Sequence, residues 1–157
     1  MLLAFAALLW MAGCAPVFSR QALDQVDRSI SFHELQSDPE HYQGKWVMLA
    51  GVIINTNNTN EGTFVEVLQK PMGRRGRPLD TDVTGGRFII SSAQFLDAAV
   101  YLPGRLITVI GEAAGQKFQQ IGEIEYRYPV VTAKELHLWE PSAGPQFIFG
   151  VGIYHGY

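Results

Sequence analysis

The sequence has one cysteine, few charged residues and no long apolar segment after its N-terminus. A single cysteine excludes an intramolecular disulfide and any metal site built from several cysteines. A membrane-spanning helix needs about 20 consecutive apolar residues, and no such run follows residue 14. The 12 basic residues are outnumbered by 15 acidic ones, so no overall positive charge draws the chain to nucleic acid. We therefore expect no nucleic-acid partner.

Sequence motifs of catalysis are also missing. No serine lies in a Gly-x-Ser-x-Gly motif, and no glycine loop has the spacing of a phosphate cradle. Glu123 and Glu125 are expected to share a solvated strand face rather than to act as an acid–base pair. The histidines lack the spacing of metal ligands and are expected at the surface or at helix ends: His33, His41, His137 and His155. The sequence predicts a protein that is not an enzyme and binds no metal or dissociable cofactor.

The rest of the composition favours one globular all-β domain. Of 157 residues, 47% are apolar and 24 are glycine or proline, 16 and 8 respectively, which is typical of short strands joined by turns. Strands are predicted over residues 45–56, 63–68, 86–91 and 105–112, with one or two more in 118–139. Gly51 predicts a bend in the first strand, and the polar residues 55–62 predict a turn.

These elements predict a small OB-like barrel of five to six strands with one or two short helices. A β-sandwich is the alternative. Ser31 and Glu34 have the spacing of a capping box and predict a short helix that Pro39 limits. Pro129 is expected at an edge or a break in the last strands. Residues 94–102 are expected to form a helical or irregular crossing.

The N-terminus is an unbroken apolar run over residues 1–13, too short to span a bilayer. Such a run is typical of the hydrophobic region of a signal peptide. Ala12 and Gly13 are small enough for a signal peptidase to bind the extended backbone, and Cys14 follows directly. The pattern predicts a lipobox, with cleavage between Gly13 and Cys14 and a diacylglycerol on the Cys14 thiol. The alternative is a buried N-terminal helix with a free cysteine.

The surroundings of the lipobox bear on the translation start and on the destination. No Lys or Arg precedes Cys14, although signal peptides begin with a positive segment. We therefore expect the true start upstream, or an internal Met taken as the start. Ala15, in place of an aspartate, favours the outer membrane. Residues 14–30 are predicted to be the lipidated N-terminus and a tether, with room for a short strand or helix that joins the fold.

A basic loop is the main candidate for binding. Four of the twelve basic residues fall within eight positions: Lys70, Arg74, Arg75 and Arg77. The functional interpretation is contact with anionic groups of the envelope, such as lipid headgroups, lipopolysaccharide phosphates or peptidoglycan carboxylates. The alternative is a solvated loop balanced by Asp80 and Asp82. Residues 141–157 form a tail rich in glycine and aromatics, predicted either to strap the barrel or to dock on a partner or membrane.

Several segments, in order from residue 12 to 139, resemble the Slp-type outer-membrane lipoproteins of Gram-negative bacteria. The lipobox is one of them, and the segment 101–111 with its Tyr-Leu-Pro-Gly-Arg start is another. The remaining segments are residues 39–44, 51–54 with Asn57, 63–71, 77–78, 86–89, 95–97, 121–123, 126–131 and 138–139. No single segment is specific, but the combination is.

The resemblance implies a periplasmic lipoprotein held in the outer membrane by a diacylglycerol and an N-acyl chain on Cys14. Residues 31–140 would be the Slp-like barrel domain. Family members are associated with stationary phase, starvation and envelope stress, so we expect a non-enzymatic role in envelope integrity or stress tolerance, through binding or scaffolding. The expected partners are the bilayer and anionic envelope components or another envelope protein. The alternative is a barrel that binds an oligosaccharide or peptidoglycan fragment.

Overall fold

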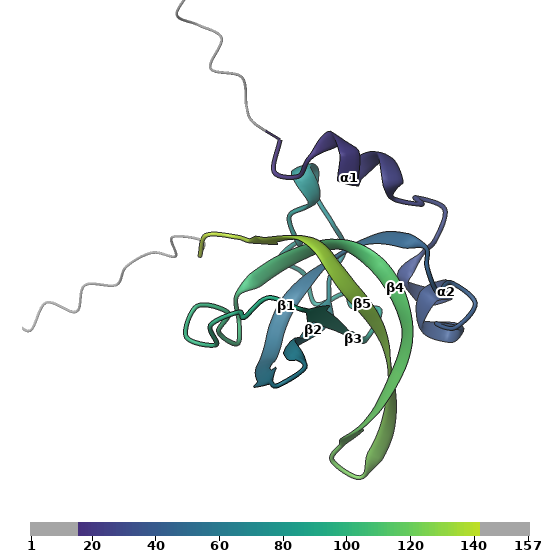
Figure 1. Ribbon diagram of the computed structural model, residues 1–157, viewed down its shortest axis with the longest axis vertical. Helices are drawn as coiled ribbons and strands as arrows, with labels where there is room; N and C mark the ends of the chain where they lie inside the picture. The colour runs from purple at the N-terminus through teal and green to yellow at the C-terminus, as the bar shows by residue number, and fades with distance from the viewer. Residues whose placement is uncertain (1–15, 142–157) are drawn as a thin grey trace, which may run out of the picture.

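The computed structural model describes residues 16–141 of the chain. Two short helices, one turn of 3-10 helix and five strands follow one another in this part of the chain (Figure 1). They are α1 (Arg20–Gln25), α2 (Phe32–Ser37), β1 (Trp46–Thr59), β2 (Gly62–Gln69), η1 (Arg74–Gly76), β3 (Arg87–Ser92), β4 (Leu106–Ile121) and β5 (Ile124–Leu138).

The five strands form a closed barrel in the order β1-β2-β3-β5-β4, in which β4 returns to pair with β1. All neighbouring pairs are antiparallel except β3 and β5, which are parallel. The predicted all-β, OB-like barrel with one or two short helices is confirmed, with five strands. The alternative of a β-sandwich is wrong, because the sheet closes on itself and leaves no separate second sheet.

β1 pairs with two different strands, and it changes from one to the other near Gly51. Residues 46–52 pair with β4, and residues 51–59 pair with β2. A Cβ atom on Gly51 would lie 2.1 Å from the carbonyl oxygen of Leu68, closer than real atoms approach. The irregularity predicted at Gly51 lies slightly later in the strand, as a register shift between Ile53 and Asn55. Glycine thus permits the close approach that lets one strand serve two neighbours.

Both long hairpins turn later than predicted. The turn expected over residues 55–62 shrinks to the two residues between Thr59 and Gly62. β4 continues to Ile121 instead of ending at residue 112. Pairing between consecutive strands satisfies the backbone N–H and C=O groups whatever the side chains are. A polar, turn-rich composition therefore does not end these strands.

The start of β5 differs in part from the prediction. Pro129 lies inside β5, paired with Gln116 next to a register shift, and β3 pairs with β5 only from Val130 onward, so Pro129 is at an edge, as expected, and not at a break. The shift fits a residue that has no N–H to give to the ladder. Gly122, with φ 60°, lies in the turn before β5. Glu123 is in the same turn, so the prediction that it shares a strand face with Glu125 is wrong.

Apolar side chains from the strands fill the barrel. The core cluster includes Val47, Leu49, Ile53, Val65, Val67, Phe88, Ile90, Ile107, Val109 and Val131. The predicted capping box at α2 is confirmed: Glu34 N–H donates to Ser31 Oγ at 3.2 Å, and Ser31 N–H donates to the Glu34 carboxylate at 2.8 Å. The capped helix places Leu35 in the core with 1% of its surface exposed. The crossing at residues 94–102 is irregular, without a helix.

The segment before α2 is part of the folded body. Phe18 and Ala22 are 4% and 5% exposed and pack with Ile110 of β4 in a second apolar cluster. The prediction of a tether over residues 14–30 therefore does not hold from about Phe18 onward. A short helix joins the fold there, as the sequence allowed, and the body begins near Phe18 rather than at residue 31. This segment has no clear helical period of apolar residues, but the burial of Phe18 and Ala22 holds the helix against the barrel.

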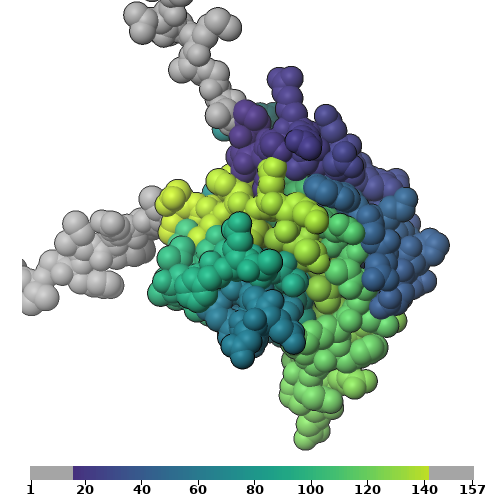
Figure 2. Space-filling view, viewed as in Figure 1, coloured from purple at the N-terminus to yellow at the C-terminus, as the bar shows by residue number. Residues whose placement is uncertain are grey.

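One hairpin extends beyond the barrel. β4 pairs with β1 only as far as Glu112, and β5 pairs with β3 only from Val130 onward. Residues 116–129 therefore find strand partners only within their own hairpin, and we call them the arm. The arm forms a narrow projection at the opposite end of the molecule from α1 (Figure 2). Near its tip, Phe118 and Ile124 are 53% and 70% exposed.

Replacement of Gly51 by Ala should lower the free energy of unfolding by about 2–4 kcal/mol, because the new methyl group forces β1 away from β2. Urea denaturation of the purified protein measures this change. Gly122→Asn is the matched control: its surroundings are open, and Asn tolerates positive φ, so a change within about 0.5 kcal/mol is expected. A Gly51→Ala protein as stable as the wild type would contradict the role of this close approach.

Candidate functional sites at the two ends of the barrel

The structure divides the predicted basic loop into two pairs of residues. Lys70 Nζ donates to the carbonyl oxygen of Thr81 at 2.6 Å. The Arg77 guanidinium lies 5.3 Å from the centre of the Trp139 ring and donates to the Glu140 carbonyl oxygen at 3.4 Å. These two basic side chains are thus held by the protein itself. Both line a hollow of 640 Å³ that also contains Asp80 and Asp82, in line with the balanced-loop alternative for this pair.

Arg74 and Arg75, in contrast, are exposed on η1. Arg75 is the one residue other than glycine with positive φ in the described chain, at 59°. Strained backbone of this kind persists only where the surroundings hold it. Here Gly73 N–H donates to the Arg77 carbonyl at 2.8 Å, and the buried Thr108 of β4 donates its hydroxyl to the Gly76 carbonyl at 2.7 Å. The loop is therefore fastened to the barrel while two guanidinium groups point outward.

A mostly apolar pocket of 420 Å³ lies between this loop and the start of the described chain. Its walls are six apolar residues, two glycines and two arginines: Pro16, Val17, Phe18, Leu23, Met48, Met72, Gly73, Gly76, Arg28 and Arg75. We call it the N-terminal pocket. Figure 1 shows α1 and η1 side by side at this end of the barrel. Its volume lies in the range usual for ligand sites, roughly 300–1,000 Å³.

A smaller polar groove lies on the outer face of the barrel, next to the arm. Its volume is 110 Å³, and it is lined by Asn55, Asn57, Phe64, Glu66, Ile89, Lys117 and Gln119. Lys117 Nζ from the arm lies 4.5 Å from the centre of the Phe64 ring on β2. We call this hollow the barrel-face groove. Its volume is well below that of usual ligand sites, and it contains a single aromatic ring.

At the floor of this groove, Glu66 joins three strands. Its Oε1 accepts the Tyr128 hydroxyl at 2.7 Å and the Arg87 guanidinium at 2.8 Å. Burial, and then the hydrogen bond and charge of Glu66, raise the pKa of Tyr128 to about 12. The hydrogen bond that Arg87 donates to Glu66 also raises the pKa of Arg87. The cluster therefore holds a neutral phenol and a permanent cation against one carboxylate.

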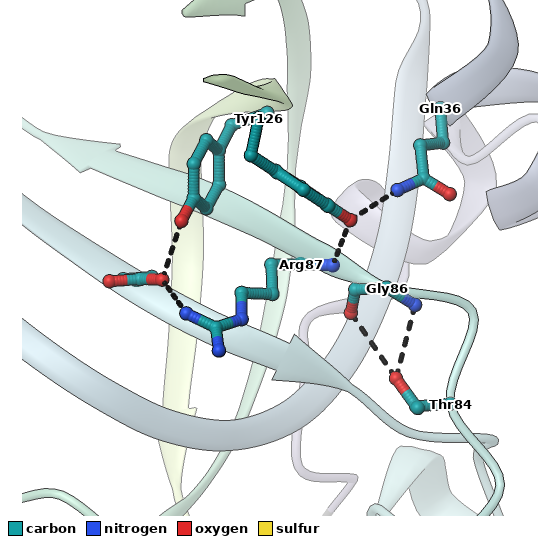
Figure 3. Close-up of polar contacts among 7 residues, drawn as sticks. Gln36, Thr84, Gly86, Arg87 and Tyr126 are labelled. Atoms are coloured by element: carbon teal, nitrogen blue, oxygen red, sulfur yellow. Dashed lines mark hydrogen bonds and ion pairs between the residues drawn. The ribbon is translucent and has the colours of Figure 1, made fainter. Parts of the chain in front are cut away.

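A second tyrosine joins the middle of the arm to α2 (Figure 3). The Tyr126 hydroxyl oxygen accepts hydrogen bonds from the Arg87 backbone N–H, at 2.9 Å, and from the Gln36 side chain. A Cβ on Gly86 would meet both of these side chains, and its φ is 127°. None of these contacts was predicted from the sequence. The available signal was Glu66, a lone acid within an otherwise apolar strand.

The histidines, which the sequence did not predict to form a site, are apart in the structure. His137 packs edge-on against Trp139, with ring centres 4.4 Å apart, and His41 packs against Tyr42. Within residues 16–141, no three His, Cys, Asp or Glu side chains are grouped so that they could hold a metal ion. No helix in that part of the chain is long and apolar enough to cross a membrane. Gly13, Cys14 and the tail from residue 142 lie outside the described residues.

With the geometry established, comparison with known proteins gives the family. The family model described as "Outer membrane lipoprotein Slp family" matches residues 11–151. The chain belongs to this family. The resemblance inferred from the sequence is thus confirmed, and the Slp-family chain is an outer membrane lipoprotein by membership.

Three relatives of the Slp-family chain carry little functional description. An uncharacterized protein of Haemophilus influenzae is 33% identical over 71% of the chain. The outer membrane protein Slp of Escherichia coli K12 is 24% identical over 74% of it. In both cases the match spans 61% of the relative's length. The uncharacterized lipoprotein YeaY of E. coli K12 is 24% identical over 95% of the chain and 81% of its own length.

Among solved structures, the mitochondrial single-stranded DNA-binding protein of S. cerevisiae has a TM-score of 0.37 at 16% identity, covering 60% of this chain and 94% of its own. A small single-stranded DNA-binding protein of Streptomyces coelicolor has a TM-score of 0.36 at 10% identity, with the same coverage. Likenesses this distant pass no function to the Slp-family chain.

Replacement of Tyr128 by Phe tests the Glu66 cluster through its pH dependence. The pKa of about 12 exceeds the value near 10 of an unfolded tyrosine. Stabilisation by the neutral phenol is therefore complete below about pH 10 and is lost as pH rises through about 12. Between these values the wild type should lose on the order of 2 kcal/mol more stability than Tyr128→Phe.

Ultraviolet absorbance titration of tyrosinate, with urea unfolding at each pH, measures both effects. One tyrosine of the wild type should ionise near pH 12, and this step should vanish in Tyr128→Phe. Tyr42→Phe, which replaces a half-buried tyrosine outside the cluster, should retain it. A late step of equal size in wild type and Tyr128→Phe would show that Glu66 does not hold this phenol.

Proposed function

We propose that this Slp-family chain is a non-enzymatic binding domain, tethered to the outer membrane through lipid on Cys14 and facing the periplasm, that serves envelope integrity or stress tolerance. One observation carries this proposal: the end of the barrel that the N-terminus enters and the arm lie at opposite ends of the molecule (Figure 1). A domain anchored through residues just before Pro16 would hold its arm away from the membrane. It would be oriented as a receptor or scaffold.

The anchor is supported by the lipobox and by family membership. A diacylglycerol with an N-acyl chain exceeds the two hydrophobic signals that stable membrane attachment needs, since each buried CH₂ contributes about 0.8 kcal/mol. Only a few residues separate Cys14 from the packed Phe18. The folded body would therefore stand directly on the membrane surface, not on a long tether.

The arm has the features of a protein-binding element. Beyond the barrel, each of its strands has one edge without a strand partner among the described residues, and such edges can accept a strand from another protein. Phe118 and Ile124 add exposed apolar surface near the tip. The charged Lys117, Glu125 and Arg127 are interspersed with them, which limits self-association. We assign the arm to another envelope protein as partner.

The oligosaccharide alternative has weaker support. The inside of the barrel is filled by apolar side chains, so a ligand would have to lie in a surface groove. The barrel-face groove has the right polar chemistry, with amides, a carboxylate and an ammonium group. Its volume of 110 Å³ and its single ring, already covered by Lys117, are small for a sugar chain.

The anchor predicts a defined mass. The protein extracted from membranes should have the mass of a chain beginning at Cys14 plus a diacylglyceryl group and an N-acyl chain, as measured by intact mass spectrometry. Cys14→Ser should leave the protein without lipid and release it from the outer-membrane fraction. An unacylated Cys14 in wild-type membranes would remove the basis of the proposal.

The arm predicts a phenotype that depends on position. In a strain that lacks the gene, Phe118→Ser with Ile124→Ser should restore survival of acid stress no better than an empty vector, because the apolar tip is lost. The matched control is Val83→Ser with Phe95→Ser, which removes side chains that are 63% and 74% exposed outside the arm and should complement fully. Circular dichroism checks the fold of both proteins. Full complementation by the arm variant would refute this role.

A further inference from the structure

We propose that the N-terminal pocket binds one acidic glycerophospholipid of the membrane to which the chain is anchored. Arg28 and Arg75 would hold the phosphate, and the apolar walls would contact the upper part of an acyl chain. The inference rests on the proposed lipid anchor, and it adds a specific lipid site to it. Three features of the pocket carry it: its position, its charge and its pre-formed shape.

The pocket lies next to the proposed lipid anchor. Pro16 and Val17 line the pocket, and Cys14 precedes Pro16 by two residues. A lipid on Cys14 would therefore be attached only two residues along the chain from the pocket wall. A chain anchored at Cys14 therefore has this pocket at the bilayer surface, where phospholipid is the most concentrated ligand. The same reasoning does not apply to the barrel-face groove next to the arm.

The charges fit a phosphate. Arg28 and Arg75 are exposed residues that line the pocket, and the structure records no ion pair or hydrogen bond for either guanidinium among residues 16–141. Asp27 lines only an adjoining hollow of 220 Å³, where Ser29 lowers the pKa of its carboxyl through hydrogen bonds. Guanidinium groups recognise phosphate through paired hydrogen bonds. Each basic group near an anionic membrane also contributes roughly 1 kcal/mol.

The apolar part of the pocket fits the glycerol and acyl region of the same lipid. Phe18 belongs to the second apolar cluster, and Met48 and Leu23 pack against it. Met72 is 42% exposed at the edge. Flexible methionine side chains adapt to irregular ligands such as acyl chains. A free phosphate would leave this surface uncovered, whereas a phospholipid covers both the charged and the apolar parts.

The pocket is pre-formed because its wall is fastened to the barrel. Thr108 donates to the Gly76 carbonyl and in turn accepts the Trp139 indole N–H at 2.9 Å. Gly76 has φ 79°, and a Cβ there would lie 2.3 Å from the Met48 methyl group. The loop therefore packs directly against Met48, and its positive φ at Gly76 favours glycine there. Arg75, with its own positive φ, is held beside the pocket by this arrangement.

The test uses the full lipidated protein in vesicles with phosphatidylglycerol whose acyl chain is photoactivatable, and peptides with adducts are identified by mass spectrometry. We expect adducts on the peptides that contain Met48 and Met72. A neutral phosphatidylcholine probe with the same acyl chain should label them at least about fivefold less. Arg28→Gln with Arg75→Gln should reduce labelling by phosphatidylglycerol about tenfold, because both phosphate partners are lost.

The matched control is Arg20→Gln with Arg74→Gln, which removes one exposed charge from α1, a few residues before Arg28, and one from the same loop as Arg75, both outside the pocket. Labelling should stay within twofold of the wild type. An equal loss in both double variants would mean general surface attraction, and equal labelling by both probes would mean that the phosphate charge is not recognised. Either result overturns the inference, as does the absence of adducts at Met48 and Met72.

Two further measurements distinguish a phospholipid site from a site for free phosphate, and a failure of this inference from a failure of the proposed anchor. Excess inorganic phosphate should leave labelling unchanged, and if it abolishes labelling, the site is one for free phosphate and the lipid proposal falls. The intact mass of the same sample reports the lipid on Cys14. An acylated protein without pocket adducts would refute only this inference. Adducts on a protein whose Cys14 is unmodified would refute the anchor and leave the pocket standing.

Discussion

The closed barrel depends on the pairing of β1 with two strands, β4 up to Val52 and β2 from Gly51 onward. Without a backbone that can approach Leu68 so closely, β1 could pair with β2 or with β4, but the sheet would stay open. Closure lets one layer of apolar side chains fill the whole interior and removes the free edges from the barrel itself. It also fixes the two ends of the molecule: α1 with η1 at one end, and the arm at the other.

The fold could be predicted because its signals are local. β-branched runs, Gly51 and the capping box at Ser31 each lie within a few residues of the feature they specify. The ends of the strands could not be predicted in this way. The Asn- and Thr-rich residues 55–59 and the segment after residue 112 stay extended only because a neighbouring strand pairs with them. The packing of Phe18 on Ile110 likewise joins positions far apart in the sequence, so residues 17–25 look like a linker on local evidence.

The candidate sites could be predicted only in part, because their residues are also far apart in the sequence and meet only in the fold. The density of basic residues identifies the loop at residues 70–77, but it cannot show that Lys70 and Arg77 are held by the protein while Arg75 is not. The N-terminal pocket requires Arg28 and Met48 to meet that loop across the fold. Glu66 could be noticed as a lone acid in an apolar strand. Its partners Arg87 and Tyr128 become evident only once β3 and β5 are neighbours.

The parallel pairing of β3 with β5 has a consequence for how the chain reaches its native state. It spans only residues 89–91 and 130–132, whereas the hairpins β1–β2 and β4–β5 close through turns of two residues. Hairpins form within microseconds, but a contact between distant segments must first offset the entropy of closing a long loop. We therefore expect the two hairpins to assemble before β3 pairs with β5. The Glu66 cluster joins β2 to both of these strands, so its contacts are expected to form last.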